Sequence, residues 1–97
     1  MQNQNTETKE FTTKDLLLAS TLVTLGFPYS GPTISYEGSR GRAVGFWIFK
    51  EDENLALARR QYNSGLLRVE PRALWSSLSG LKSEVASVVE SSSPNTI

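Results

Sequence analysis

The fold of this chain is decided by the apolar run Ala43–Phe49, which reads AVGFWIF. This run lies between the glycine-rich turn Glu37–Arg42 (EGSRGR) and the charged stretch Lys50–Glu53 (KEDE). A short apolar run, rich in β-branched and aromatic residues and bounded by turn signals, is typical of a strand buried on both faces. In a chain of 97 residues, we expect the chain's own helices to cover one face. The other face then takes a partner, a ligand or a second copy.

Alternate residues of this strand point to opposite faces of the sheet. Val44, Phe46 and Ile48 form one face, which is wholly apolar and which we expect to pack on the helices. The other face carries Trp47 and Phe49, and we expect these two aromatic rings to be available for stacking on a ligand. The alternative is that both faces are core or dimer interface.

Hydrophobic periodicity and capping signals predict the remaining elements. Further strands are expected at Glu10–Thr12, Thr33–Tyr36 and Leu66–Val69, and helices from a Thr12 cap to Leu25, from Glu51 or Asp52 to Tyr62, and from Pro71 to Val88. The fold class is therefore α+β, with a small β-α-β-β-α-β sheet in ferredoxin-like order, a C-terminal helix, and helices on one face. Because the first and last strands are short, a three-stranded meander is the alternative. We expect a single domain over residues 10–90, between disordered tails at residues 1–9 and 91–97.

Composition narrows the function classes. Ten Lys and Arg balance ten Asp and Glu, so the net charge is zero, which argues against a general electrostatic nucleic-acid binder. The chain has no cysteine and no histidine, so the sequence predicts no enzyme, metal or cofactor. It also lacks a signal-peptide pattern and an apolar stretch of the ~20 residues needed to cross a membrane, and we expect a cytoplasmic protein without membrane contact.

Arginines supply the candidate ligand contacts. Arg40 and Arg42 lie in the glycine-rich turn, where we expect guanidinium groups and backbone N–H groups to converge on a phosphate. Arg59 and Arg60 on the second predicted helix are expected to extend this positive surface. The alternatives are a hairpin turn kept soluble by charge and ordinary ion pairs along a helix. Trp75, beside the apolar seam of the last helix, is the candidate interface residue, because tryptophan is enriched at binding hot spots.

Three segments together resemble a family of small bacterial and phage proteins known only as a domain of unknown function. They are Phe11–Phe27 with its helix ending in Leu-Gly-Phe, Gly45–Asp52 with its aromatic strand and acidic helix start, and Tyr62–Arg72 with the pattern Tyr-x-x-Gly-x-Leu-x-Val-x-Pro. The resemblance covers roughly Phe11 to Val85. It implies an accessory protein of phages or mobile elements that acts by binding, and it carries no site residue over.

The sequence thus predicts a non-enzymatic binding module that forms a homo-oligomer. In the leading hypothesis it holds a phosphate-bearing ligand, either a nucleotide such as a signalling nucleotide or a short stretch of nucleic acid. Arg40 and Arg42 would then contact phosphate, and Trp47 or Phe49 would stack the base. The alternative is a protein-interaction module that docks a host or phage protein through its apolar sheet face and Trp75.

Overall fold

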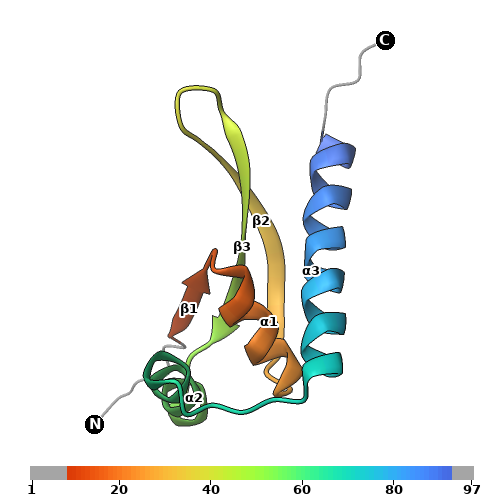
Figure 1. Ribbon diagram of the computed structural model, residues 1–97. Coiled ribbons are helices and arrows are strands. Elements are labelled where there is room, and N and C mark those ends of the chain that lie inside the picture. Colours follow the sequence, from red (N-terminus) through yellow and green to blue (C-terminus); the bar gives the residue numbers. More distant parts are fainter. Residues whose placement is uncertain (1–8, 93–97) are drawn as a thin grey trace, which may run out of the picture.

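The computed structural model describes residues 9–92, which form three antiparallel strands in one sheet and three helices. The predicted α+β class with a C-terminal helix is confirmed. Figure 1 shows the elements, which are β1 (Glu10–Thr13), α1 (Leu16–Thr24), β2 (Tyr29–Glu37), β3 (Arg42–Lys50), α2 (Glu53–Ser64) and α3 (Pro71–Ser92). The predicted tails lie mainly outside the described residues, except that α3 continues two residues past the expected domain end.

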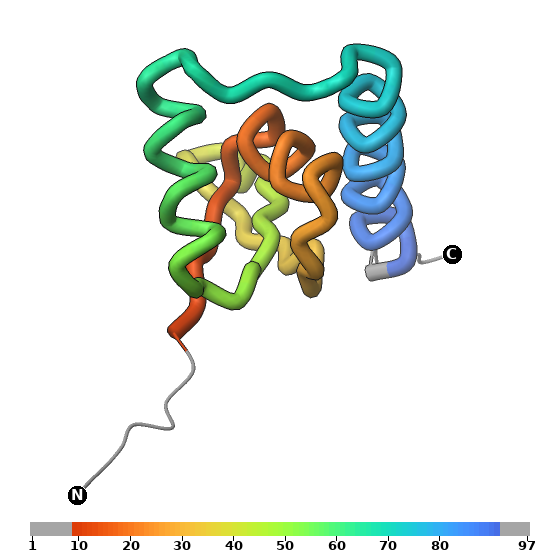
Figure 2. The backbone as a smooth tube through the Cα atoms, turned by 90° about the horizontal axis from the view of Figure 1, so that it is seen from below, coloured from red at the N-terminus to blue at the C-terminus, as the bar shows by residue number. Residues whose placement is uncertain are grey.

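The predicted ferredoxin-like order is wrong because Leu66–Val69 forms no strand. This segment connects the end of α2 to the start of α3 and passes α1 on the helical side of the molecule (Figure 2). An extended segment there has no strand edge with which to pair. The meander alternative correctly gives three strands, but its strand order is wrong, since the sheet order is β1-β3-β2 and β3 lies in the centre.

Local capping determines where α1 begins and ends. Asp15 is the N-cap, and its Oδ1 accepts a hydrogen bond from the backbone N–H of Leu18 at 3.1 Å. The predicted Thr12 cap is wrong because Thr12 still belongs to β1. At the other end Gly26, at φ 98°, donates to the carbonyl of Val23, and Phe27 donates to that of Leu22. These two bonds form a Schellman motif, as the glycine predicted.

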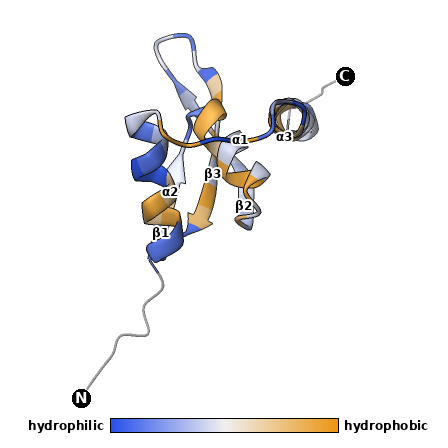
Figure 3. Cartoon of the chain, turned by 60° about the horizontal axis from the view of Figure 1, so that its bottom comes forward, coloured by the Kyte–Doolittle hydropathy of each residue, from blue (hydrophilic) through white to orange (hydrophobic). Residues whose placement is uncertain are grey.

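The core forms where α1 lies between α2 and α3 (Figure 2). Its buried side chains come from all three helices and from β3: Leu18, Ala19, Leu22, Trp47, Phe49, Leu55, Ala58 and Leu81. Figure 3 shows that hydrophobic residues gather on α1 and on the adjoining end of β3, whereas the tip of the β2–β3 hairpin is hydrophilic. The hairpin therefore extends away from the core as a two-stranded arm.

The two faces of β3 are the reverse of what the sequence predicted. Trp47 and Phe49 are 2% and 0% exposed and pack beneath the helices, so this is the inner face of the sheet. Val44, Phe46 and Ile48 point to the outer face, lie outside the core cluster and are half-buried. Both faces of the run are apolar, so the alternation did not distinguish them. The larger aromatic pair takes the helical side, where it removes more apolar surface from water.

Candidate functional site

The turn arginines lie together at the tip of the hairpin. Arg40 and Arg42 line a hollow of about 380 Å³ with Glu37, Gly38 and Ser39. Both side chains are exposed, and neither forms an ion pair with any residue between 9 and 92. The turn that the sequence predicted is therefore confirmed, and its two cations are free to bind an anion.

Trp47 and Phe49 are unavailable as a stacking platform. Phe49 is completely buried, and its ring centroid lies 6.0 Å from that of Tyr29. Trp47 is 2% exposed within the same core. A base could reach either ring face only if the helices separated from the sheet. The prediction that these rings stack a ligand is wrong, because it assumed the opposite orientation of β3.

Arg59 and Arg60 do not join the turn arginines. They lie on α2, at the opposite end of β3 from the hairpin turn (Figure 1). Arg59 donates to Glu51 Oε2 at 2.9 Å, and its guanidinium carbon lies 3.8 Å from the ring centroid of Phe11. These contacts stabilise the junction between α2 and β1. Arg60 is exposed and lines a surface hollow of about 570 Å³ with Leu57 and Leu66.

The structure adds a groove that the sequence did not predict. β1 pairs only with Trp47–Lys50, so one edge of Arg42–Phe46 pairs with no strand among residues 9–92. A hollow of about 350 Å³ lies beside this unpaired edge, lined by Lys14, Leu16, Arg42, Ala43, Val44, Gly45, Trp47, Lys82 and Val85. We call it the edge groove. Its only sequence signal is the mismatch between a short first strand and a long central one.

Cations dominate the rim of the edge groove. Lys82 and Arg42 are exposed and have no ion-pair partner in the described part of the chain. Lys14 pairs with Glu37 at 3.1 Å, but the two side chains are 61% and 42% exposed, and solvent-accessible pairs of this kind contribute little to stability. An incoming carboxylate can therefore replace Glu37 at small cost. The groove lining contains no acidic residue.

One buried donor in the groove lining has no partner. The indole Nε1 of Trp47 is shielded from solvent and makes no hydrogen bond within residues 9–92. A buried N–H without an acceptor costs about 1 to 3 kcal/mol of stability. Trp47 is thus both a core residue and part of the groove lining.

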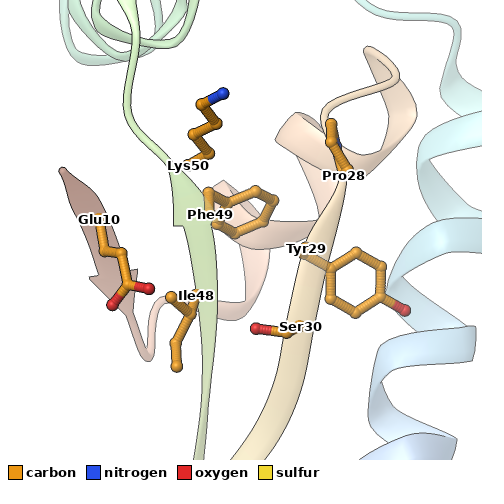
Figure 4. A pocket seen from close by; sticks show the side chains of 7 residues that line it. All are labelled: Glu10, Pro28, Tyr29, Ser30, Ile48, Phe49 and Lys50. Carbon is orange, nitrogen blue, oxygen red and sulfur yellow. The ribbon is translucent and has the colours of Figure 1, made fainter. Parts of the chain in front are cut away.

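A second polar feature ties α3 to the sheet. The hydroxyl of Tyr29 on β2 donates to Glu84 Oε2 at 2.6 Å, and Figure 4 shows Tyr29 pointing toward α3 beside Phe49. This hydrogen bond, the burial of the phenol and the negative charge of Glu84 together raise the pKa of Tyr29 to about 12. The neighbouring hollow of about 230 Å³ has Glu10 and Lys50 on its rim. We assign the Tyr29–Glu84 pair a structural role.

The predicted interface residue Trp75 is 68% exposed on α3. Residues 9–92 hold no cluster of three side chains suited to a metal ion, and none of their helices has the length and hydropathy to cross a bilayer.

The chain matches no family model, no curated protein and no solved structure.

Proposed function

We propose that this chain is a non-enzymatic protein-interaction module that docks a partner protein on the outer face of its sheet. The observation that carries the proposal is the stripe of Val44, Phe46 and Ile48, which lies on the side of β3 opposite the helices. Apolar side chains on an uncovered sheet face lose water-exposed area when a partner protein packs on them.

The surroundings of this stripe suit a protein partner. The strand register places hydroxyl side chains beside it on both flanks: Thr12 on β1 and Ser30, Thr33 and Ser35 on β2. In the strand register, residues of opposite charge lie at both ends, Glu10 opposite Lys50 and Glu37 opposite Arg42, and the carboxylate of Glu37 pairs with Lys14. A neutral face with an apolar centre and a polar rim is typical of a non-obligate protein interface and unlike a surface for nucleic acid.

Substitution on the outer face tests the proposal. Phe46→Asp places a charge in the stripe without entering the core, and Leu57→Asp is the control, since Leu57 is a 45% exposed apolar residue on α2. Each variant is used as bait in pull-downs from a lysate of the host at high salt. We expect wild type and Leu57→Asp to recover one stoichiometric partner protein, and Phe46→Asp to recover none. The purified partner must then bind with the same pattern. Retention by Phe46→Asp would contradict the proposal, and a dimer broken by Phe46→Asp alone would make the partner a second copy.

A second candidate function rests on the free cations of the turn. Here the module binds a phosphate-bearing ligand through Arg40 and Arg42, which share one hollow. Buried Trp47 and Phe49 have no part in this version. The aromatic residue nearest the turn in register is Tyr36, opposite Ala43 and 61% exposed, and it takes over the stacking role.

Titration tests the phosphate hypothesis directly. Native mass spectrometry of the purified protein first shows whether a nucleotide-like adduct is bound. Calorimetry with that nucleotide, or with ATP when no adduct is found, then compares wild type with Arg40→Ala and Arg42→Ala. Each variant is expected to lose about 1–3 kcal/mol of binding free energy, as for a charge-assisted hydrogen bond. Unchanged titration curves for both variants would remove this candidate.

A further inference from the structure

We propose that the edge groove binds an extended, acidic peptide segment of a partner, which adds to the sheet as a strand beside Arg42–Phe46. This inference goes beyond the docking of a protein on the outer face, because it concerns the backbone groups at an edge of the sheet and the cations around it, with Val44 as the one side chain shared with the stripe. It does not require the outer-face proposal to hold.

The backbone of β3 supplies the first argument. β1 ends at Thr13, opposite Trp47, and the chain then leaves the sheet to begin α1. Beyond that point β3 continues to Arg42 and is paired only with β2 on its other edge (Figure 1). Alternate residues of an antiparallel strand direct their N–H and C=O groups to one side, so the groups on this side lack a strand partner. A peptide strand in line with β1 would satisfy them.

The charges around the groove indicate the chemistry of the peptide. Lys14, Arg42 and Lys82 come from three different segments of the chain and line the same hollow, which contains no acidic side chain. The chain as a whole has no net charge, so this gathering of cations is local. It attracts carboxylates and repels a basic peptide, which gives specificity and a faster encounter.

The floor of the groove indicates that acidic residues alternate with apolar ones. Leu16, Trp47 and Val85 provide apolar surface on the helical side of the β3 edge. Successive side chains of an added strand point to opposite faces, so every second residue of the peptide faces this floor. Trp47 lines this hollow and is 2% exposed, so a bound peptide strand would lie against its edge.

A displayed library of random decapeptides tests this proposal, because selection from it does not require the natural partner. The bait is the full chain, and counter-selection uses Lys82→Glu, which reverses an exposed charge on the groove rim. The matched control is Arg72→Glu, an exposed charge on the first turn of α3 outside the groove. We expect enrichment of acidic peptides with alternating apolar residues. Their affinity should fall about five- to tenfold with Lys82→Glu and remain unchanged with Arg72→Glu.

Two further measurements distinguish strand addition from simple charge attraction. Methylation of alternate backbone nitrogens in a selected peptide removes donors but no side chain, and is expected to abolish binding in one of its two registers. In a Trp75→Phe background Trp47 is the single tryptophan, so peptide binding should change its fluorescence.

The opposite outcomes are equally clear. No enrichment over the counter-selection bait, enrichment of basic peptides, or equal binding of both methylated forms would overturn the proposal. A dimer of the free chain that is lost with Lys82→Glu and is not displaced by the peptides would assign the groove to a second copy instead. Ile48→Asp changes the same outer-face stripe but lies outside Arg42–Phe46 and outside the groove lining. It should abolish docking on the outer face and leave peptide binding intact, so failure of one proposal is distinguishable from failure of the other.

Discussion

The two halves of β3 have similar apolar sequences and different surroundings. The half formed by Trp47–Lys50 is paired with β1 on one edge and β2 on the other, and its inner-face aromatic rings are completely covered. The half formed by Arg42–Phe46 is paired on one edge only and borders an open, cation-rimmed groove. We call them the paired half and the open half. The comparison teaches that strand neighbours, more than side-chain hydrophobicity, separate a core segment from a binding surface.

The largest expected difference between the two halves comes from matched phenylalanine substitutions. Phe49→Ala empties a fully buried site in the paired half and is expected to lower the free energy of unfolding by about 3–5 kcal/mol. Phe46→Ala, in the open half and half-buried, is expected to cost about 1–2 kcal/mol. Urea unfolding followed by circular dichroism measures both. Equal losses would contradict the division of β3, and Phe49→Leu replaces Phe49→Ala if that variant does not fold.

Removal of the Tyr29 hydroxyl tests how much the hydrogen bond between the sheet and α3, next to the paired half, contributes to stability. Tyr29→Phe leaves the Glu84 carboxylate without its phenol donor, and Glu84 Oε1 is already buried without a partner. We expect a loss of about 1.5–3 kcal/mol in chemical denaturation. Tyr36→Phe is the control, because Tyr36 is 61% exposed. Similar losses in both variants would contradict a specific role for the Tyr29–Glu84 bond.

The same pair predicts a dependence of stability on pH. The pKa of Tyr29 is about 12 in the folded chain and 10.0 in its ordinary state, so the folded chain holds this proton more tightly. The stability that this group contributes is fully present below pH 10 and is lost as the pH rises through 12. Between pH 9 and 12, the free energy of unfolding should fall more steeply with pH for wild type than for Tyr29→Phe. An equal fall in the free energy of unfolding for both proteins would show that other titrating groups cause the pH dependence.

A smaller effect is expected where the open half approaches α3. A Cβ built at Gly45 would lie 2.7 Å from Cγ2 of Val85, so Gly45→Ala should force the strand and helix apart and cost about 1–2 kcal/mol. Gly80→Ala is the control, since nothing lies within 4 Å of a Cβ there and alanine favours a helix by about 0.5–1 kcal/mol. A double-mutant cycle with Val85→Ala should recover part of the Gly45→Ala cost. If the two substitutions lowered the free energy of unfolding additively, the cost of Gly45→Ala would not come from its contact with Val85.

The smallest expected difference concerns the two neighbouring arginines of α2. Arg59→Ala removes the ion pair with Glu51 and the contact with the Phe11 ring, at an expected cost of about 1 kcal/mol in thermal or urea unfolding. Arg60→Ala should change stability by less than about 0.5 kcal/mol, as is usual for an exposed residue. A larger effect for Arg60 than for Arg59 would contradict the assignment of Arg59 to the junction of α2 and β1.

Local signals in the sequence predicted the helices and the hairpin well. Gly26 and Pro28 correctly indicated the end of α1, Asp52 caps α2, and Pro71 begins α3. The turn arginines also lie together as predicted. Signals of this kind depend on a few neighbouring residues, so they do not change with how the rest of the chain packs.

Predictions that needed a partner from elsewhere in the chain were wrong. Leu66–Val69 is mostly apolar, which favours a strand, yet it runs past α1 from α2 to α3 and pairs with none of the strands β1, β2 and β3. Likewise, the sequence predicts that the rings of Trp47 and Phe49 stack on a ligand, whereas the helices cover both rings. Strand formation and burial both depend on which surfaces meet, and alternation along one segment does not encode that.

By itself, the sequence determined a small α+β chain whose central strand is apolar on both faces, with arginines concentrated in one turn. The tertiary structure alone decided which face the helices cover, how far β1 accompanies β3, and that Lys14, Arg42 and Lys82 border one groove. The physical reason is that secondary-structure signals act over a few residues, whereas burial and charge gathering are set by contacts between distant segments. In this chain the binding surfaces arise from those long-range contacts.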